Sequence, residues 1–352
     1  MLNSLKIRNY RNLRHLTIEK LGRVNLLVGK NNTGKTSVLE AVYLWVNNGR
    51  FDLIYEVLET RAGTVESTAE DRYQRNGLTI ASMFSDRRAT SIKEYSIYIE
   101  VNNNNAYSSL TLSFEEGYQG VGGSQLLSFG INHTNLGRTL VIPLHQTINP
   151  KDLDYRPYDW PTSKKNQFVK SSEIDGANTG YLYDEIATTD WEQEVVNTLK
   201  VIDSRISKLA FRTDSTSGKR YPVVRLEGNI SPLPLRSMGD GINRILTIIL
   251  AMVNCENGYL LIDEFENGLH YSVQEKLWEI IFHLAERLNI QVFATTHSND
   301  TIKAFGEVAK SKPEYSDAQL IQLRNVKGII SAVLFNTDDV ETAMETDYLD
   351  LR

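Results

Sequence analysis

The sequence predicts an α/β fold that combines a central, mostly parallel sheet with an antiparallel side sheet and a helical lobe. Three observations support this prediction. The apolar segment 24–28 is followed by a glycine loop and then by apolar residues at helical spacing. Alternating apolar and polar residues recur between 78 and 114, as in strands with one buried face. Between 223 and 305, short apolar runs alternate with helical patterns, which is typical of a parallel sheet whose strands are joined by helices.

Length and composition describe one large globular unit. The chain has 352 residues, of which 41% are hydrophobic and 23% charged, so we expect a single domain over 1–352 with one main core. The lone Cys255 excludes an internal disulfide and favours a reducing compartment. The longest apolar run, 245–253, is far shorter than the roughly 20 residues that span a bilayer. The N-terminus has no signal-like apolar stretch either, so we expect a cytoplasmic protein without a membrane partner.

Charge is unevenly distributed along the chain. The net charge is −6, yet residues 1–50 carry nine Lys and Arg against Glu19 and Glu40. Residues 338–352 carry six acids against Arg352 alone. A solvated basic face and an acidic tail explain both runs, while the basic N-terminal bias leaves a nucleic acid partner as an alternative.

The N-terminal lobe, residues 1–48, is predicted to hold the glycine loop behind a buried strand. The segments 2–7 and 16–19 alternate apolar and polar residues, so both are expected to be half-buried strands that lead into the central strand 24–28. Apolar residues over 38–46 form a helical stripe that ends near Asn47-Asn48-Gly49.

The next part, residues 76–148, is expected to form the side sheet, with strands over 78–80, 95–101 and 109–114. The Gly-, Ser- and Asn-rich residues 115–137 and the Pro-containing residues 149–166 are expected to be surface loops.

The remaining residues are predicted to hold the helical lobe and the other motifs, over 166–305, and then C-terminal strands and the acidic tail, over 306–352. The elements expected in the first range are two helices between 181 and 206, a strand over 223–226, a helix over 242–253, a strand over 259–262 and a strand over 290–295.

The loop from Gly29 to Thr36 fits the pattern G-x-x-x-x-G-K-[ST] between a strand and a helix, the context that a phosphate-binding loop requires. Backbone N–H groups and the helix start attract phosphate oxygens, and Lys35 adds a full positive charge near the β- and γ-phosphates. The Thr36 hydroxyl can bind Mg²⁺. We therefore predict ATP and Mg²⁺ at this loop, with nucleotide contacts from Asn31, Asn32, Thr33, Gly34, Lys35, Thr36 and Ser37.

Two further strands end in side chains suited to phosphate chemistry. The apolar segment 259–262 is followed by Asp263 and Glu264. Successive strand residues point in opposite directions, so Asp263 is predicted to hold the metal while Glu264 faces the γ-phosphate and polarises the attacking water. His297 follows the strand 290–295 and is predicted to contact the γ-phosphate. The predicted catalytic residues are Lys35, Glu264 and His297.

A fourth motif, Ser237-Met238-Gly239-Asp240-Gly241, precedes the apolar helix 242–253. Ser237 is expected to anchor the N-terminus of that helix, and the small residues leave backbone amides open to an anion. Taken alone, this pattern describes an ordinary helix cap.

The order of these four motifs resembles the ABC-type ATPases of the SMC, RecF and OLD (overcoming lysogenization defect) class. The segment 5–13, the pair Glu40-Ala41 and the segment 264–270 are most similar to OLD-type ATPase domains, and in particular to stand-alone ones. The resemblance spans nearly the whole chain and is weakest over 50–165. It implies an ABC-type P-loop ATPase fold and Mg²⁺-dependent ATP hydrolysis.

The resemblance also implies a homodimer or larger oligomer that forms head to tail with ATP. Ser237 and Gly239 of one protomer would close on the γ-phosphate held by the other. The segment 266–270 would cross between the two sites, with His270 as a helix cap or a dimer contact. The chain departs from the ABC transporters, which have Ser-Gly-Gly where it has Ser-Met-Gly. The family's metal-contacting glutamine is expected to be Gln146, with Gln167 as the alternative.

The function implied by the resemblance is a nucleotide-driven switch. Full-length OLD proteins carry a C-terminal Toprim nuclease, and the acids after His297 lack its Asp-x-Asp spacing. The resemblance to stand-alone OLD-like ATPases therefore implies that this chain controls a separate effector protein and acts in prokaryotic antiphage defence. The alternatives are a RecF-like DNA-binding ATPase in repair and a module that holds ATP without hydrolysing it. The absence of sustained heptads disfavours SMC-like arms.

Overall fold

The computed structural model describes residues 1–62, 79–87, 95–104, 106–119, 125–137, 139–143, 162–171 and 176–336. Three predicted features lie outside these residues: most of the loop 149–166, Gln146, and the acidic tail 338–352.

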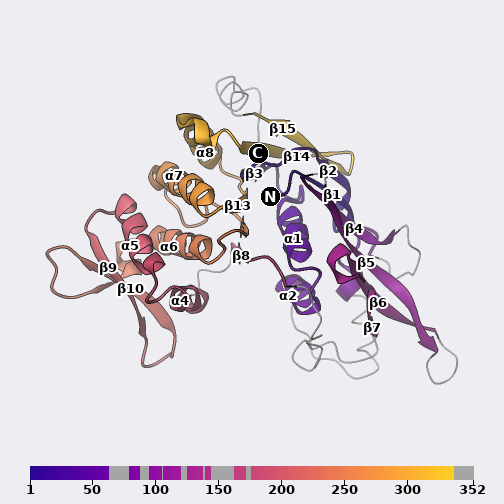
Figure 1. Ribbon diagram of the computed structural model, residues 1–352, viewed down its shortest axis with the longest axis horizontal. Helices are drawn as coiled ribbons and strands as arrows, with labels where there is room; N and C mark the ends of the chain where they lie inside the picture. Colours follow the sequence, from indigo (N-terminus) through magenta and orange to yellow (C-terminus); the bar gives the residue numbers. More distant parts are fainter. Residues whose placement is uncertain are drawn as a thin grey trace.

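A six-stranded sheet runs through the middle of the molecule (Figure 1). Every neighbouring pair is parallel except the last two strands of the chain, which pair antiparallel. The carboxyl ends of five adjacent strands therefore meet at one edge, where α/β proteins place their ligands. In spatial order the strands are β15 (Ile329–Phe335), β14 (Ala318–Val326), β3 (Val24–Val28), β13 (Gln291–Thr295), β12 (Tyr259–Ile262) and β8 (Asn166–Val169).

Both faces of this sheet are covered, which explains why its inner strands β3, β13 and β12 are buried along their whole length and mostly apolar. Along β3, Leu26 belongs to one hydrophobic core and its neighbour Leu27 to the other, as the alternation of a strand requires. The core around Leu27 also contains α1 (Lys35–Val46), which lies between the central sheet and the side sheet. The core around Leu26 is closed by α6 (Asp240–Val253), α7 (Tyr271–Arg287) and α8 (Asn299–Ser311).

The side sheet consists of six antiparallel strands. The two N-terminal strands form one of its edges, because Leu5 lies opposite Val101 of the fourth strand of the chain. The helix α2 (Phe51–Ala62) follows α1 and precedes the later strands of this sheet. In spatial order the strands are β2 (Leu13–Ile18), β1 (Ser4–Tyr10), β4 (Ile97–Asn103), β5 (Ala106–Gln119), β6 (Gln125–His133) and β7 (Thr139–Pro143).

The predicted strand over 78–80 is wrong. Residues 79–81 are helical, with Ile80 and Ala81 buried, and Ser82 N donates to Thr79 O. The segment Leu78-Thr79-Ile80 is too short for its apolar spacing to distinguish a strand from a helical turn.

The predicted loop over 115–137 is also wrong, because most of it extends β5 and forms β6. Phe129 and Ile131 of β6 are buried on one face. A Cβ on Gly130 would lie 2.7 Å from Cγ of Glu115 on β5. The glycine therefore permits close contact between two strands, whereas the sequence pattern was interpreted as a turn.

The helical lobe lies at the opposite end of the molecule from the side sheet (Figure 1). The two helices predicted between 181 and 206 are present as α4 (Gly176–Asp184) and α5 (Asp190–Ile202). The strand predicted at 223–226 belongs to a small antiparallel sheet that the sequence did not otherwise reveal: β9 (Ile206–Thr213), β10 (Arg220–Leu226) and β11 (Leu233–Pro234).

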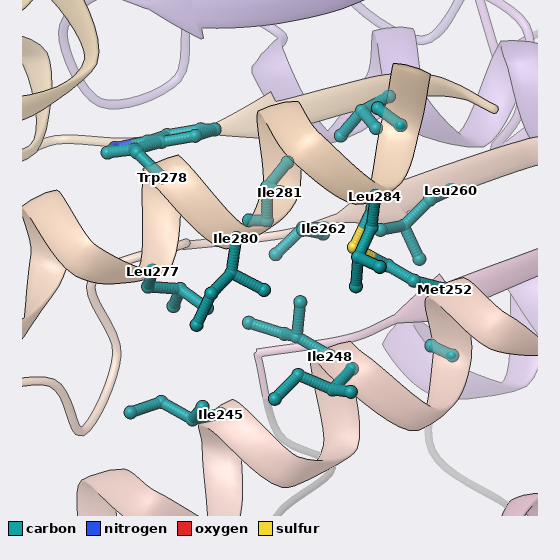
Figure 2. Close-up of a cluster of buried hydrophobic side chains, with 14 of the residues drawn as sticks. Ile245, Ile248, Met252, Leu260, Ile262, Leu277, Trp278, Ile280, Ile281 and Leu284 are labelled. Atoms are coloured by element: carbon teal, nitrogen blue, oxygen red, sulfur yellow. The ribbon is translucent and has the colours of Figure 1, made fainter. Parts of the chain in front are cut away.

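The helix α6 joins this lobe to the central sheet. Figure 2 shows Ile245, Ile248 and Met252 of α6 beside Ile262 of β12 and Leu284 of α7. This continuous apolar contact makes α6, β12 and α7 one packed unit. Among the described helices, none combines the length and the apolar character needed to cross a membrane.

Candidate active site

Residues that follow neighbouring strands converge at the carboxyl edge of the central sheet. The loop 29–36 follows β3, Asp263 and Glu264 follow β12, and residues 296–298 follow β13. Backbone hydrogen bonds hold these strand ends together: Thr296 N donates to Leu27 O at 3.1 Å, and Asp263 N donates to the last residue of β8 at 3.0 Å. The site is thus assembled from the ends of four strands.

The loop 29–36 requires glycine at two positions. Gly29 has a φ of +142° and Gly34 a φ of +89°, values that L-residues with a Cβ rarely adopt. A Cβ would lie 2.4 Å from Leu323 O at Gly29 and 2.7 Å from a methyl group of Leu13 at Gly34. Gly34 is also the N-cap of α1 and has no side chain to bond the first N–H groups of the helix. Those groups are oriented to bind an anion, and the helix dipole adds to the attraction.

Lys35 points back into the loop and reaches the end of β13. Its Nζ donates to Gly29 O at 2.6 Å and to Lys30 O at 3.0 Å, and lies 3.2 Å from His297 Nδ1. Burial lowers the pKa of Lys35 to about 8, and the nearby carboxylate of Glu266 is the largest opposing influence. Burial removes water from the ammonium of Lys35, so its attraction to a negatively charged phosphate would be strong.

Thr36, Asp263 and Thr295 form a compact oxygen cluster. Thr36 Oγ1 donates to Asp263 Oδ1 at 3.1 Å, and Thr295 Oγ1 donates to the same oxygen at 2.7 Å. A hydroxyl beside one carboxylate fits Mg²⁺, which keeps several waters and takes further oxygens from substrate phosphates. Thr36 and Asp263 are therefore the residues that would hold Mg²⁺, although the described part of the chain contains no group of three or more His, Cys, Asp or Glu that could hold a metal on its own.

Glu264 adopts a left-handed backbone conformation with φ of +49°, which is uncommon for a residue with a side chain. Its N–H donates to Thr295 Oγ1 at 2.9 Å, and Phe265 N donates to Thr295 O at 2.8 Å. The buried Thr295 therefore bonds both the carboxylate of Asp263 and the backbone of Glu264. Strain that is held in place by surrounding bonds is common in active sites.

His297 contacts Lys35 through Nδ1. An ammonium can only donate, so Nδ1 is the acceptor and the ring proton is on Nε2. Burial, and then the charge of Lys35, lower the pKa of His297 below its usual value, which keeps the imidazole neutral near pH 7. Nε2–H is therefore available as a donor to a phosphate oxygen.

A pocket of about 500 Å³ opens beside the loop and the start of α1. Its lining includes the predicted residues from Asn32 to Ser37 and His297, whereas the predicted contact Asn31 is exposed and outside it. The β1–β2 turn also lines the pocket, and Asn12 Nδ2 of that turn donates to Asn32 O at 2.9 Å. The segment 82–87 completes the lining. The turn lies within the OLD-like segment 5–13, but no sequence signal indicated 82–87.

Ser237 and Gly239 do not belong to the pocket lining within the described chain. The predicted role of Ser237 as anchor of α6 is wrong: Gly239 is the N-cap, no side chain caps the helix, and Ser237 Oγ donates to Pro234 O at 2.7 Å. Ser237 lies in the short 3-10 turn η3 (Leu235–Met238), and both residues are exposed. The start of α6 therefore presents open N–H groups at the surface.

The metal-contacting role expected for Gln146 or Gln167 stays a prediction. Gln146 lies outside the described residues. Gln167 lies opposite Leu260 in the first half of β8, three positions before the acids at the strand edge. The carboxyl end of β8 is instead followed by Lys170 and Ser171.

Arg244 of α6 is a buried site residue that sequence reasoning missed. It is 2% exposed, and its guanidinium donates to Lys170 O and to Asp263 O, each at 2.8 Å. It thereby ties α6 to the ends of β8 and β12. The sequence signal that could have identified it is an arginine within the mostly apolar segment 242–253.

The predicted cap at His270 is confirmed by the structure. His270 is the N-cap of α7, and its side chain accepts a hydrogen bond from Ser272 N.

Known proteins share these features. The family model described as an AAA ATPase domain matches residues 1–116 and 178–302. An ATP/GTP phosphatase of Helicobacter pylori is 22% identical over 92% of each chain. A DNA replication and repair protein RecF of Clostridioides difficile is 51% identical over 43 residues, which are 12% of each chain. A solved SMC head bound to the C-winged helix domain of ScpA matches with a TM-score of 0.56 and 12% identity, over 96% of this chain and 98% of that one, which shows a shared fold.

Proposed function

The chain belongs to the AAA ATPase domain family, and from this premise we propose that it acts as an ATP-clamped, head-to-tail dimer whose nucleotide state controls a separate effector protein. The chain is an ATPase of the class related to RecF and SMC proteins, as its motifs predicted. One observation supports the dimer above all others. The loop 29–36, Asp263, Glu264 and His297 meet at one edge, where Thr36 bonds Asp263 and Lys35 contacts His297. Ser237 and Gly239 are exposed and bond within their own turn, to Pro234 O and Arg236 O.

Each residue has a separate part in the proposed reaction. The loop N–H groups and Lys35 hold the phosphates of ATP. Glu264 accepts the proton of the attacking water, and His297 donates from Nε2 to an oxygen of the γ-phosphate. Thr36 and Asp263 would hold Mg²⁺, which would supply positive charge to offset that of the phosphates.

The dimer follows from the position of the uncapped start of α6. Its open N–H groups suit an anion, but they lie outside the pocket of their own chain. A second protomer in a two-fold arrangement brings Ser237 and Gly239 to the γ-phosphate held by the first. Both sites are then completed together, and ATP joins the two chains.

The proposed effector is a separate protein that contacts the ATPase. An SMC head of this fold is bound to the C-winged helix domain of ScpA, which supports contact with a partner protein by analogy. From the resemblance to stand-alone OLD-like ATPases we propose that such a switch acts in prokaryotic antiphage defence.

The dimer is tested by slowing hydrolysis. Glu264→Gln removes the base but keeps the size of the side chain, so turnover should fall about 100-fold or more while ATP and Mg²⁺ binding remain. Size-exclusion chromatography with light scattering should show a dimer with ATP and a monomer without it. Unchanged turnover would exclude Glu264 as the base, and a monomer at saturating ATP would exclude the clamp.

The effector is tested by co-purification. The Glu264→Gln protein, tagged and expressed with the products of neighbouring genes, should retain a second protein with ATP and release it without ATP. A chain that remains alone in both conditions would contradict the switch.

A RecF-like DNA-binding ATPase is the second candidate, because a RecF protein matches locally. The charge distribution gives it little support. Basic residues of 1–50 are largely neutralised by acids, in the pairs Lys6–Glu100, Arg11–Glu40, Arg14–Asp86, Arg23–Glu286 and Arg50–Asp52. Duplex DNA binding at low salt that needs ATP and falls steeply with added salt would favour this candidate over the effector switch.

A further inference from the structure

The half-buried carboxylate of Glu266 bonds the turn that carries His297. Its Oε1 accepts from His297 N at 2.7 Å, and its Oε2 accepts from Thr296 Oγ1 at 2.7 Å. Thr296 is fully buried, and its Oγ1 accepts in turn from Ser298 N at 3.0 Å. Hydrogen bonds to an ionised acceptor are stronger than neutral ones. One carboxylate therefore organises three consecutive residues after β13.

Glu266 belongs to the loop 264–270 between β12 and α7, and this loop is anchored on both sides of it. The buried Phe265 stacks on Trp278, with ring centres 4.1 Å apart and planes at 5°. On the other side, Asn267 Nδ2 donates to Ser171 O at 2.8 Å. These contacts of Phe265 and Asn267 fix the backbone on both sides of Glu266. A shift of the loop would therefore also move the Glu266 carboxylate.

Glu266 acts on the backbone of His297 and leaves the ring free. The ring contacts Lys35 through Nδ1 and keeps Nε2–H for a phosphate oxygen. A purely structural reason for Glu266, capping of α8, is not needed, because Ser298 caps α8 with its own side chain by accepting from Thr301 N.

We propose that Glu266 is a positioning residue that couples the loop 264–270, which faces the other protomer in the proposed dimer, to His297. This inference rests on the proposed function. While the loop is seated, the carboxylate holds the turn so that Nε2–H of His297 meets the γ-phosphate. Displacement of the loop releases the turn, and hydrolysis slows without loss of bound nucleotide.

Three variants of the full chain separate the bonds of Glu266. Glu266→Ala removes both acceptors and should lower kcat about 30-fold, with KM for ATP within about threefold. Glu266→Gln keeps a carbonyl oxygen for His297 N and should recover most of that loss. Thr296→Val leaves the bond to His297 N intact and should lower kcat by only a few-fold. Glu275→Gln, on the exposed face of α7, is the matched control and should leave both constants unchanged.

A spectroscopic measurement shows whether His297 itself is affected. The chain has six histidines, so selective ¹⁵N-histidine labelling gives few amide signals, and His297→Gln identifies the one sought. Glu266→Ala should move this signal upfield and speed its hydrogen exchange, since the bond to the carboxylate is lost. Glu275→Gln should not move it.

The outcomes distinguish this inference from the function on which it rests. If Glu264→Gln stops turnover but Glu266→Ala keeps the wild-type kcat, the positioning role is wrong and the ATPase assignment of Glu264 stands. An equal loss in the Ala and Gln variants, with an unmoved His297 signal, would also overturn it. If Glu264→Gln keeps full turnover, the failure belongs to the proposed function.

Discussion

At the scale of single residues, Thr295 links Asp263, the proposed metal ligand, to Glu264, the proposed catalytic base. Its hydroxyl donates to Asp263 and accepts from Glu264 N, where the backbone is left-handed. Neither bond was foreseeable, because a threonine at the end of a strand is ordinary in sequence, and its partner strand lies elsewhere in the chain. The role of Thr295 can be recognised only when the pairing of β13 with β12 is known.

Thr295→Val should lower kcat by about 10- to 100-fold and change KM little, because the acids lose their shared support while the phosphate loop is untouched. Steady-state ATPase kinetics measures this. Thr198→Val is a matched control, since its hydroxyl only back-bonds Glu194 O in α5, far from the site. Equal behaviour of the two variants would contradict the role of Thr295.

His133 should make stability depend on pH. It is 1% exposed, and burial lowers its pKa to about 4. The unfolded chain therefore binds a proton between about pH 6.5 and 4 that the folded chain does not bind, so stability is complete above pH 6.5 and is lost as the pH falls. The contribution of this group to that loss is about 3 kcal/mol.

Urea denaturation at pH 7 and pH 4.5 of the wild type and of His133→Asn checks this expectation. Asparagine can still accept from Asn135 N, as Nδ1 of His133 does at 3.0 Å, but it does not titrate. The variant should lose less free energy of unfolding between the two pH values. Parallel losses would show that carboxylates alone cause the acid sensitivity.

At the scale of elements, α6 is coupled to the catalytic edge by Arg244 as well as by apolar packing. Arg244→Met keeps the aliphatic volume but leaves the carbonyls of Lys170 and Asp263 without their guanidinium donor, at a cost of about 1–3 kcal/mol each. We expect a lower free energy of unfolding and a loss of ATPase activity. Arg244→Lys, which cannot bridge both carbonyls, should be intermediate. Wild-type stability and activity in the Met variant would exclude the coupling.

Elements with a strong apolar signal were predictable, and those defined by pairing were not. The segments 24–28, 259–262 and 290–295 were predicted as strands because burial on both faces makes them apolar throughout. The strand β8 was missed, since only Val169 among its residues is buried. Residues 125–133 were missed because their glycine serves contact with β5. The strands β9 and β11 stabilise each other only through β10, so no local pattern reveals them.

The candidate site was predictable where a motif is contiguous. The loop 29–36 and the acids after β12 were identified from spacing and context, and the structure brings them together with His297. Residues that act through distant partners, among them Glu266 and the segment 82–87, required the fold. The order of the motifs implied the family. It did not indicate which residues bond to the motif side chains and hold them in position.

At the scale of the whole molecule, the proposed dimer should allow complementation. Lys35→Ala disables the loop of its own chain, and Ser237→Arg blocks the site of the facing chain, so each variant alone should be inactive. A random mixture forms mixed dimers with one intact site, which should restore about a quarter of wild-type turnover. ATPase assays of the separate and mixed proteins measure this. No recovery on mixing would mean that each site is complete within one chain.

The strand order also determines when the protein becomes functional during its synthesis. The side sheet consists of strands that precede residue 144 and can pair early, but β3 lies between β13 and β14, which are synthesised much later than β3. The phosphate-binding loop therefore lacks its neighbours in every shorter nascent chain. A product truncated before β13 would therefore carry the phosphate-binding loop without the strands that flank β3 in the folded sheet.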